Sequence, residues 1–453
     1  MKSIKFWISF LSAFWKKFKG LVFLSSILGI IAFLLVPRVE PLLTNFSDGE
    51  RIGIVGRYGI DEIPSGIQNQ ISLGLTSLDE SDNTVSGLAS SWEVQDSGKV
   101  WIFKLGNHKW QDGTKVVAKD INYKFSDASS EVVDEQTIKF VLKDPFSPFP
   151  TVVSRPIFKR GLLGAGDWKV EKFTFFSNSH YLNSLKLKKI KSQEIQTYKF
   201  YLTENDARTA LKLGEVDKLI DIVDPKDFSA WKNIKVEPGV RLDRYVGIFI
   251  NTEDPILSDK SVRQALAYAI DKSAFSEERA VSPVSPKSWA YNPQVKQYNY
   301  NPDRAKELLS SIPKEQRANL TIKLVTTPTL LNMADKIKNY WDAIGIKTQI
   351  QVSNTPPSDF QTLLAIQTIP TDPDQYVFWH STQLNTNITH YGKGVADQKP
   401  KESQRIDKLL EDGRRTLDQE ERKVIYQDFQ RFLVEDSPVI ILFHPTTYVI
   451  GKK

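Results

Sequence analysis

The alternation of apolar and polar positions between residues 244 and 271 predicts a strand followed by a helix. The apolar run Tyr245–Ile250 has the length and β-rich composition of a buried strand. Turn-forming residues follow up to Pro255, and Ser258 or Asp259 can cap a helix. In that helix the apolar residues fall at helical spacing and form one continuous buried face. They are Val262, Ala265, Leu266, Ala269 and Ile270. This stretch therefore predicts a core element of an α/β domain.

A second region predicts a strand–helix–strand unit. Residues 320–325 alternate as a strand, and residues 346–352 do the same. Between them an apolar stripe marks a helix that ends at Gly345. The stripe consists of Met333, Ala334, Ile337, Trp341 and Ile344. Because the joints are short, this unit predicts a parallel pair of strands and favours an α/β fold.

Other segments predict a small β-rich domain and further helices. Strands are expected at 51–58, 91–94, 100–105, 137–142 and 437–443, and helices at 205–213, 405–414 and 420–434. Three tryptophans, Trp92, Trp101 and Trp110, lie within or beside the early strands. Large aromatic side chains of this kind usually pack a core, so we expect them to be structural.

The N-terminal region predicts a membrane anchor. Residues Leu21–Val36 form an uncharged apolar run, preceded by Lys16, Lys17 and Lys19 and followed closely only by Arg38. The positive-inside rule then puts the N-terminus in the cytoplasm and the folded part outside it. A cleaved signal peptide is the alternative, but no small-x-small cleavage pattern follows the run. We expect a single-pass cell-membrane protein whose folded domain is periplasmic or extracellular.

Composition narrows the classes of function. The chain has 453 residues, enough for two or three domains, and a net charge of +6 without a dominant Lys/Arg tract. Nucleic acid is therefore not expected as a partner. The absence of cysteine excludes thiolate nucleophiles, disulfides and Cys-type zinc sites.

No catalytic or metal-binding constellation is found in the sequence. The five histidines are scattered, and neither His-Glu-x-x-His nor Gly-x-Ser-x-Gly is present. Asp372 and Asp374 flank a proline, but the glycine and terminal glutamate of a calcium loop are missing. We expect no enzyme activity, no metal and no cofactor. A hydrolase that acts on a bound peptide is the alternative.

Several ordered motifs resemble one family. Asn-Thr, Pro and Ser-Asp precede Val-Arg-Gln-Ala-Leu-x-x-Ala-Ile-Asp at 251–271, Leu-Ala-x-Ser-Trp stands at 88–92, and Gly-Glu-Val-Asp stands at 214–217. As a set they resemble the oligopeptide/dipeptide/nickel-binding solute-binding proteins of ABC transporters, bacterial extracellular family 5. Arg263 and Asp271 match family positions and are expected to be structural.

The resemblance implies a two-lobed periplasmic-binding-protein fold (type II, the large cluster C type) with an extra small β-rich domain. The expected division has a cytoplasmic segment and transmembrane helix at 1–39 and a tether at 40–50. Lobe I is expected to be discontinuous, at 51–60, 156–250 and 437–453. The small domain is expected at 61–155 and lobe II at 251–436. The hinge is expected at Asn251, Thr252 and Pro255.

A binding cleft between the lobes is the expected functional site. The segment 371–391 is rich in aromatic, amide and hydroxyl side chains, so we expect it to line the cleft. Trp379 would stack on the ligand while amides donate hydrogen bonds. The candidate ligand-binding residues are Trp379, His380, Gln383, Asn385, Asn387, Tyr391 and, at the end of the first strand, Tyr58.

The chain departs from the family pattern at one position. Peptide-binding members place an aspartate for the peptide ammonium four residues before the Asp-Pro proline, where this chain has Ile369. Asp372 matches only the turn residue before the proline, so Asp374 or another acid would have to take over. The expected partners are a peptide or similar solute and the permease and ATPase subunits of an ABC transporter. A sensor or scaffold with the same fold is the alternative.

Overall fold

The fold is described from a computed structural model. It describes residues 49–453 apart from 311, 314–319, 356, 358 and 393–400, with a few residues between 15 and 29. The expected cytoplasmic segment and anchor (1–39) and the expected tether (40–50) lie almost wholly outside the described residues. Within the described part, no helix is long and apolar enough to span a membrane.

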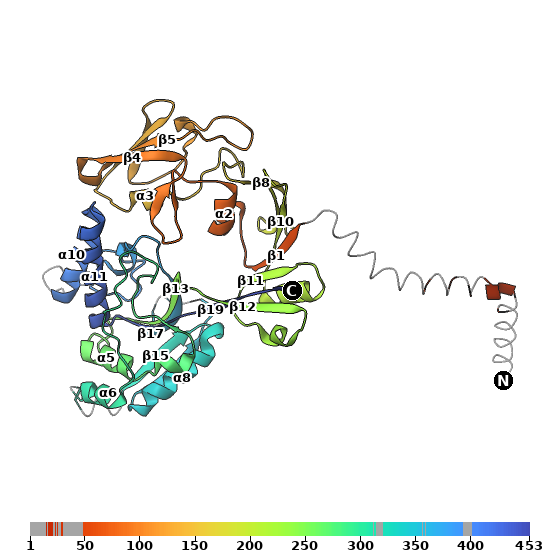
Figure 1. Cartoon of the computed structure of the whole chain (residues 1–453). Helices are drawn as coiled ribbons and strands as arrows, with labels where there is room; N and C mark the ends of the chain where they lie inside the picture. The colour runs from red at the N-terminus through yellow and green to blue at the C-terminus, as the bar shows by residue number, and fades with distance from the viewer. Residues whose placement is uncertain are drawn as a thin grey trace, which may run out of the picture.

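The first lobe is built on a mixed seven-stranded sheet (Figure 1). Its strand order is β12 (Ile234–Val240), β19 (Thr446–Lys452), β11 (Lys218–Ile222), β1 (Glu50–Val55), β10 (Ile195–Tyr201), β9 (Leu182–Lys189) and β8 (Trp168–Phe175). Strand β1 is parallel to both of its neighbours, whereas the outer pairs are antiparallel. Helix α4 (Glu204–Lys212) packs beside β1, β10 and β11.

The second lobe is built on a six-stranded sheet. Its order is β14 (Glu278–Arg279), β18 (Val439–His444), β13 (Arg244–Ile250), β17 (Thr362–Thr368), β15 (Thr321–Thr326) and β16 (Lys347–Val352). The helices of this lobe are α5 (Lys260–Tyr268), α6 (Pro302–Leu309), α8 (Leu331–Ala343), the short α9 (Tyr376–Trp379), α10 (Lys401–Arg415) and α11 (Gln419–Asp436). The predicted parallel pair is confirmed, because β15 and β16 run in parallel on either side of α8 in sequence.

The predicted core element is confirmed in its details. Strand β13 is buried from Tyr245 to Ile250, because neighbouring strands pair with both of its edges and its side chains pack in one core with residues of α5, α8 and α11. Asp259 caps α5 by accepting a hydrogen bond from the backbone N–H of Ser261. The five apolar residues predicted to form the buried face of this helix are all in the core of the second lobe.

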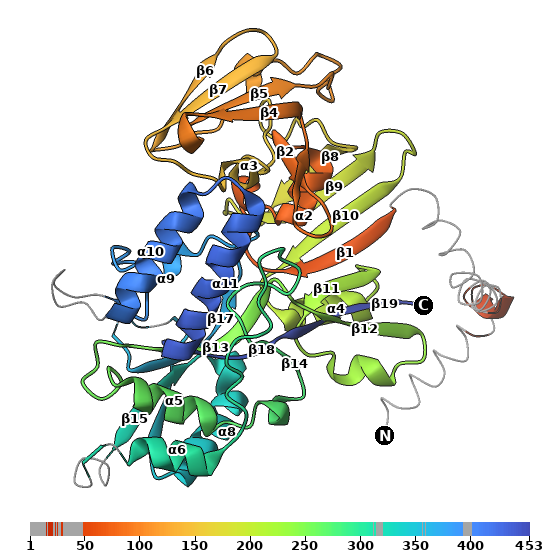
Figure 2. The ribbon, with the colours of Figure 1, turned by 60° about the vertical axis from the view of Figure 1, so that its left-hand side comes forward.

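A small four-stranded antiparallel sheet stands apart from the two large ones (Figure 2). It consists of β4 (Ala89–Gln95), β5 (Val100–Leu105), β7 (Thr137–Leu142) and β6 (Ala128–Val132), with the hairpin β2 (Thr76–Leu78) and β3 (Thr84–Ser86) nearby. Trp101 and Trp110 are buried in its core and Trp92 packs against it, as expected. The short helix α3 (Phe149–Val152) contributes Phe149 to the same core.

Helix α2 (Ser65–Ile71) packs on the first lobe rather than within the small domain. Ile63, Ile67 and Ile71 share a hydrophobic core with Leu185, Leu187 and other residues of the seven-stranded sheet. The expected domain boundary at residue 61 therefore lies too early. The small domain begins after this helix.

The chain crosses between the two large sheets at two places that differ from the expected hinge. It passes from β12 to β13 through residues 241–243 and from β18 to β19 at Pro445. The two crossings lie side by side, because the N–H of Arg241 donates to the carbonyl of Pro445 at 2.9 Å. Asn251, Thr252 and Pro255 lie beyond the far end of β13, within the second lobe. The expected assignment of β13 and β18 to lobe I is likewise wrong, since both strands pair in the second sheet.

Candidate ligand-binding cleft

Three cavities lie between the small domain and first lobe on one side and the second lobe on the other. Their volumes are about 710, 680 and 420 Å³. Helix α3 separates them, since Thr151 borders the two largest and Val152 borders the largest and the smallest. We call these three cavities together the cleft.

Half of the residues that border the 710 Å³ cavity are neutral and polar, and they come from the first lobe, the small domain and the second lobe. Helix α2 buries its isoleucines, and this leaves Ser65, Gln68 and Asn69 facing the cavity. Thr371 reaches the same cavity from the second lobe. Among the described residues that line it, Glu62 is the single acid and Arg155 the single base.

The 680 Å³ cavity is bordered by aromatic and charged residues. Trp92 and Trp101 contribute from the small domain, and Trp289 contributes from the second lobe. Arg422 and Asp372 form a bidentate ion pair in its wall, with nitrogen–oxygen distances of 2.8 and 3.2 Å. Both side chains are about nine-tenths buried, at 8% and 11% exposure. The two charges neutralise each other within the wall, so neither side chain is available to pair with a ligand.

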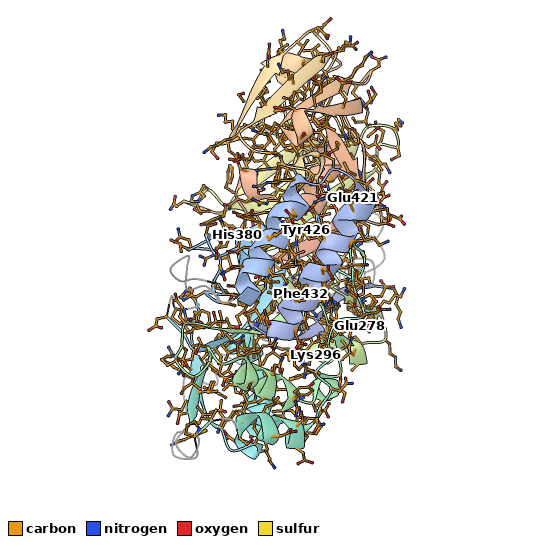
Figure 3. All side chains as sticks on the ribbon, turned by 90° about the vertical axis from the view of Figure 1, so that its left-hand side faces the viewer. Glu278, Lys296, His380, Glu421, Tyr426 and Phe432 are labelled. Carbon is orange, nitrogen blue, oxygen red and sulfur yellow. The ribbon has the colours of Figure 1, made fainter. Side chains whose placement is uncertain are left out.

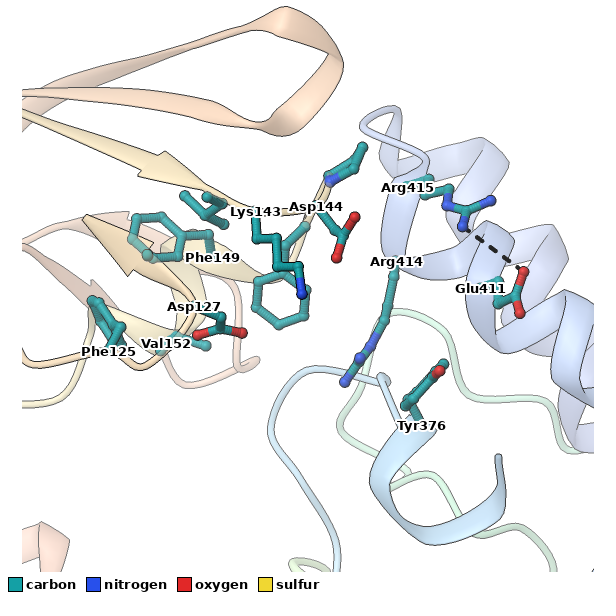
Figure 4. Close-up of a pocket in the computed structure, with 14 residues that line it drawn as sticks. Phe125, Asp127, Lys143, Asp144, Phe149, Val152, Tyr376, Glu411, Arg414 and Arg415 are labelled. Atoms are coloured by element: carbon teal, nitrogen blue, oxygen red, sulfur yellow. Dashed lines mark ion pairs between the residues drawn. The ribbon is translucent and has the colours of Figure 1, made fainter. Parts of the chain in front are cut away.

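The 420 Å³ cavity lies between the small domain and the end of α10 (Figure 4). Figure 4 shows Lys143 and Asp144 on the small-domain side, opposite Arg414 and Arg415 of α10. The guanidinium of Arg414 lies 3.9 Å from the centre of the Tyr376 ring. Phe125, Phe149 and Val152 form an apolar floor. Charges of both signs and apolar surface thus meet within one cavity.

Direct hydrogen bonds join the two sides beside these cavities. The backbone N–H of Ser147 donates to the carbonyl of Arg414 at 2.7 Å, and its hydroxyl donates to the carbonyl of Gly413 at 3.1 Å. Arg414 also lies over Phe146, 5.2 Å from the ring centre. The small domain is therefore in direct contact with the end of α10.

The structure places Trp379 inside the second lobe. It is 2% exposed, and its indole N–H donates to Gln375 at 2.9 Å. Its ring borders a separate apolar cavity of about 200 Å³ between the loop and β13, together with Tyr245 and Phe249. This tryptophan does not line the three cavities of the cleft.

His380 is also buried in the second lobe. Its ring stacks on Tyr376 with 4.0 Å between the ring centres, and one ring nitrogen lies 3.3 Å from a carboxylate oxygen of Glu411. Figure 3 shows His380 beside the long helices α10 and α11, below the small domain. Its contacts connect the loop to α10.

Three of the four remaining predicted residues of the loop form hydrogen bonds within the protein. The amide of Asn387 is fully buried and donates to the carbonyl of Tyr391 at 2.8 Å, and the hydroxyl of Tyr391 donates to Asp436 at 2.5 Å. Gln383 hydrogen-bonds within its own turn, whereas Asn385 is exposed. The loop reaches the cleft through other members, namely Thr371, Asp372 and Tyr376.

Tyr58 lies in the first lobe, half-buried against its core. Its ring centre is 5.3 Å from that of Phe200, and its hydroxyl lies 3.3 Å from the carbonyl of Val55. Burial raises the pKa of this phenol, and the charge of Asp221 raises it further. The residue is therefore near the crossings but does not border the three cavities.

Neither aspartate of the Asp-Pro-Asp motif can replace the missing family aspartate. Ile369 is buried in the core of the second lobe, Asp372 is paired with Arg422, and Asp374 accepts a hydrogen bond from Arg414 at 2.9 Å. Burial raises the pKa of Asp374, whereas the positive charge of Arg414 lowers it. Among the described residues, no group of three or more histidine or acidic side chains could hold a metal.

The first-lobe wall of the cleft was not predicted from the sequence. A signal was present there, because Ile63, Ile67 and Ile71 recur every four residues and imply that the intervening polar residues face outward. No local signal marks Arg155, Trp289 or Arg422, which reach the cleft through tertiary packing alone.

Comparisons with known proteins agree with the fold. Residues 83–387, well over half of the chain, match the family described as "Bacterial extracellular solute-binding proteins, family 5 Middle". The dipeptide-binding protein of Escherichia coli is 24% identical, with 82% of each chain covered.

Two solved structures extend the comparison. NikZ of Campylobacter jejuni in complex with Ni(L-His) gives a TM-score of 0.72 at 22% identity, covering 90% of this chain and 94% of that one. The oligopeptide-binding protein AppA of Bacillus subtilis in complex with a nonapeptide gives 0.68 at 21% identity, covering 90% and 95%. At this level of identity the likeness shows the fold.

Proposed function

Because the chain belongs to the family 5 bacterial extracellular solute-binding proteins, whose members bind solutes and are not enzymes, we propose that it captures a peptide or peptide-like solute in the cleft. The captured solute would be delivered to the permease of an ABC transporter. The observation that carries this proposal is that both sides of the molecule border the same cavities, with Thr371 facing α2 across the largest one. A solute held there would contact both lobes and favour closure.

The charges of the largest cavity favour a zwitterionic solute. Glu62 offers a carboxylate for an ammonium group, and Arg155 offers a guanidinium for a carboxylate. The neutral polar groups of α2 and Thr371 suit the amide groups between such ends. Peptide relatives support this choice, since the E. coli relative is named a dipeptide-binding protein and AppA was solved with a nonapeptide.

We further propose that the two lobes move about the paired crossings at 241–243 and 445. These are the places where the chain passes between the two large sheets. The family is extracellular, so the folded part acts outside the cytoplasm. Anchoring through the apolar run Leu21–Val36 is part of the same proposal and rests on the sequence alone.

Native mass spectrometry and calorimetry test the proposal. The purified chain is expected to carry, or to take up, peptides with free termini, and blocking either terminus should weaken binding. Ligand-loaded protein should stimulate ATP hydrolysis by its purified transporter. A tight and uniform non-peptide ligand would overturn the choice of solute, and bound solute without stimulation would overturn the transport role.

A further inference from the structure

One end of the seven-stranded sheet collects lysines from strands that are far apart in sequence. This is the end at which β1 begins, because Glu50 pairs with Gln196 near the start of β10. Strand register brings other segments to the same end. Ile195 pairs with Lys188, Lys188 with Lys169, Ile52 with Lys218, and Ile234 with Lys452.

The lysines at this end outnumber the acids that could neutralise them. Lys218 pairs with Glu50, Lys189 with Glu194, and Lys452 with Asp217. Among the described residues, five further lysines form no ion pair, whereas only two acids here, Asp167 and Glu215, form none. The five lysines are Lys169, Lys188, Lys191, Lys232 and Lys453.

Exposed apolar side chains lie at the same end of the sheet. Ile190 lies in the β9–β10 turn and is 47% exposed, Leu213 follows α4 and is 70% exposed, and Trp231 precedes β12 and is 37% exposed. Exposed apolar residues surrounded by lysines are the pattern of a surface that rests on a bilayer, because the apolar groups enter the interface while the lysines meet anionic headgroups.

We propose that this basic end, defined by the five unpaired lysines with Ile190, Leu213 and Trp231, docks on an anionic lipid surface. The position of the preceding chain favours a membrane over a soluble polyanion. Roughly 13 residues separate Val36, the end of the predicted anchor, from Glu50, and they can span at most about 45 Å. The inference therefore rests on the proposed membrane anchoring. Figures 1 and 2 show the C-terminus and the start of β1 at the same side of this sheet.

Lysine footprinting of the full chain tests the docking. The protein is mixed with, or reconstituted into, vesicles of phosphatidylcholine alone or with about one third phosphatidylglycerol. Amine acylation is then read lysine by lysine by mass spectrometry. We expect the reactivity of Lys169, Lys188, Lys191 and Lys232, and of the neighbouring Lys189 and Lys453, to fall roughly fivefold in anionic vesicles and to recover at high salt, because surface charge is screened. Equal reactivity in both vesicle types would overturn the proposal.

Matched charge-reversal variants separate this surface from a general charge effect. K169E/K188E/K191E/K232E should lose the protection of Lys189 and Lys453, which remain as reporters. The control variant K104E/K109E/K115E/K119E changes the net charge by the same amount at exposed sites of the small domain. In this variant Lys189 and Lys453 should stay protected. The same result for both variants would refute docking through this end. Protection in neutral vesicles only when the permease is added would assign the surface to a protein partner and would also refute lipid docking.

Solute binding provides an independent readout. None of the substituted lysines borders the three cavities, so solute affinity should be unchanged in both variants. Loss of lysine protection with solute binding intact would refute only the docking. Protection without any peptide binding would refute only the proposed solute.

Discussion

The largest cavity has one acid and one base among its described lining residues, Glu62 and Arg155. Glu62 and Arg155 line it without an ion pair to each other, whereas the nearby acids Asp372 and Asp374 are already paired with arginines. A buried ammonium needs a paired carboxylate. Glu62 is therefore the acid of this wall best suited to a positively charged solute group.

Replacing Glu62 tests that role. Glu62→Gln keeps the size of the side chain but removes its charge, so peptide affinity should fall about tenfold, as expected for one charge-assisted hydrogen bond. Titration calorimetry with a free and an N-acetylated peptide measures the effect. The acetylated peptide is the control. It has no ammonium group, so its affinity should be the same for the parent protein and for Glu62→Gln. An equal loss for both peptides would contradict the assignment.

Trp379 has a different role, set by its burial. Because it is 2% exposed and hydrogen-bonded to Gln375, Trp379→Ala should lower the free energy of unfolding by about 3–5 kcal/mol through the cavity it creates. Chemical denaturation measures this value. Trp231→Ala, at an exposed position, is the control and should cost far less. A fully stable Trp379→Ala protein would show that the indole is not a core residue.

At the scale of elements, ion pairs connect helices and strands that lie far apart in the sequence. Arg422, in the first turn of α11, holds Asp372 of the loop after β17 and also donates to the carbonyl of Gly413 in α10 at 2.9 Å. In the first lobe, Asp217 accepts from Arg51 of β1 and from Lys452 of β19. These contacts fix the wall of the cleft and the order of the sheet.

A double-mutant cycle tests the Arg422–Asp372 link. Arg422→Met leaves a buried carboxylate without its partner and should destabilise the protein by about 3–5 kcal/mol. Adding Asp372→Asn should recover a substantial part of that loss. Denaturant titration of the four proteins gives the coupling free energy, and strictly additive effects would show that the pair is not coupled.

Lowering the pH should weaken the hydrogen bonds and ion pairs that Asp217 forms with Arg51 and Lys452. Burial raises the pKa of Asp217, but hydrogen bonds from Arg51 and Lys452 outweigh it and bring the pKa to about 2. An unfolded aspartate titrates near pH 3.9, so the unfolded state takes up the proton first. The stability supplied by this carboxylate is complete above about pH 4 and is lost as the pH falls toward 2.

Thermal unfolding of Asp217→Asn measures this dependence. The variant should melt below the parent protein at pH 7, and the difference should shrink as the pH falls from 4 to 2. Asp335→Asn, at an exposed site on α8, is the control and should melt close to the parent throughout. A difference that does not depend on pH would exclude an ionised carboxylate as its source.

At the scale of the whole molecule, direct hydrogen bonds join the small domain to α10, and the proposed closure of the lobes would depend on them. Ser147 supplies two of them through its backbone N–H and its hydroxyl. A ligand shifts an open–closed equilibrium only as far as it prefers one state. Contacts made only in the closed state therefore add to solute affinity without touching the solute.

Ser147→Ala should weaken solute binding about fivefold by removing one hydrogen bond, worth about 1 kcal/mol, from the closed state. The change should appear mainly as faster dissociation, which stopped-flow measurements can follow. Ser90→Ala removes an exposed hydroxyl within the small domain and is the control. If Ser147→Ala left dissociation unchanged, this contact would not contribute to closure.

Much of the architecture follows from local patterns. Strand β13, the Asp259 cap of α5 and the parallel pair β15–β16 could be predicted because each depends on residue spacing within a short segment. The tryptophans of the small domain could be assigned to its core for the same reason. The family could be named because several such segments occur in one order along the chain.

The residues that line the cleft could not be predicted in the same way. Segment 371–391 has the composition of a binding loop, yet the fold turns Trp379, His380 and Asn387 into the second lobe. The crossings at 241–243 and 445 likewise depend on which sheet β13 and β18 join. The amino-acid sequence alone thus determined the elements, their order and the family. Only the tertiary structure decided which polar groups face the cleft, because burial and pairing there depend on residues hundreds of positions apart.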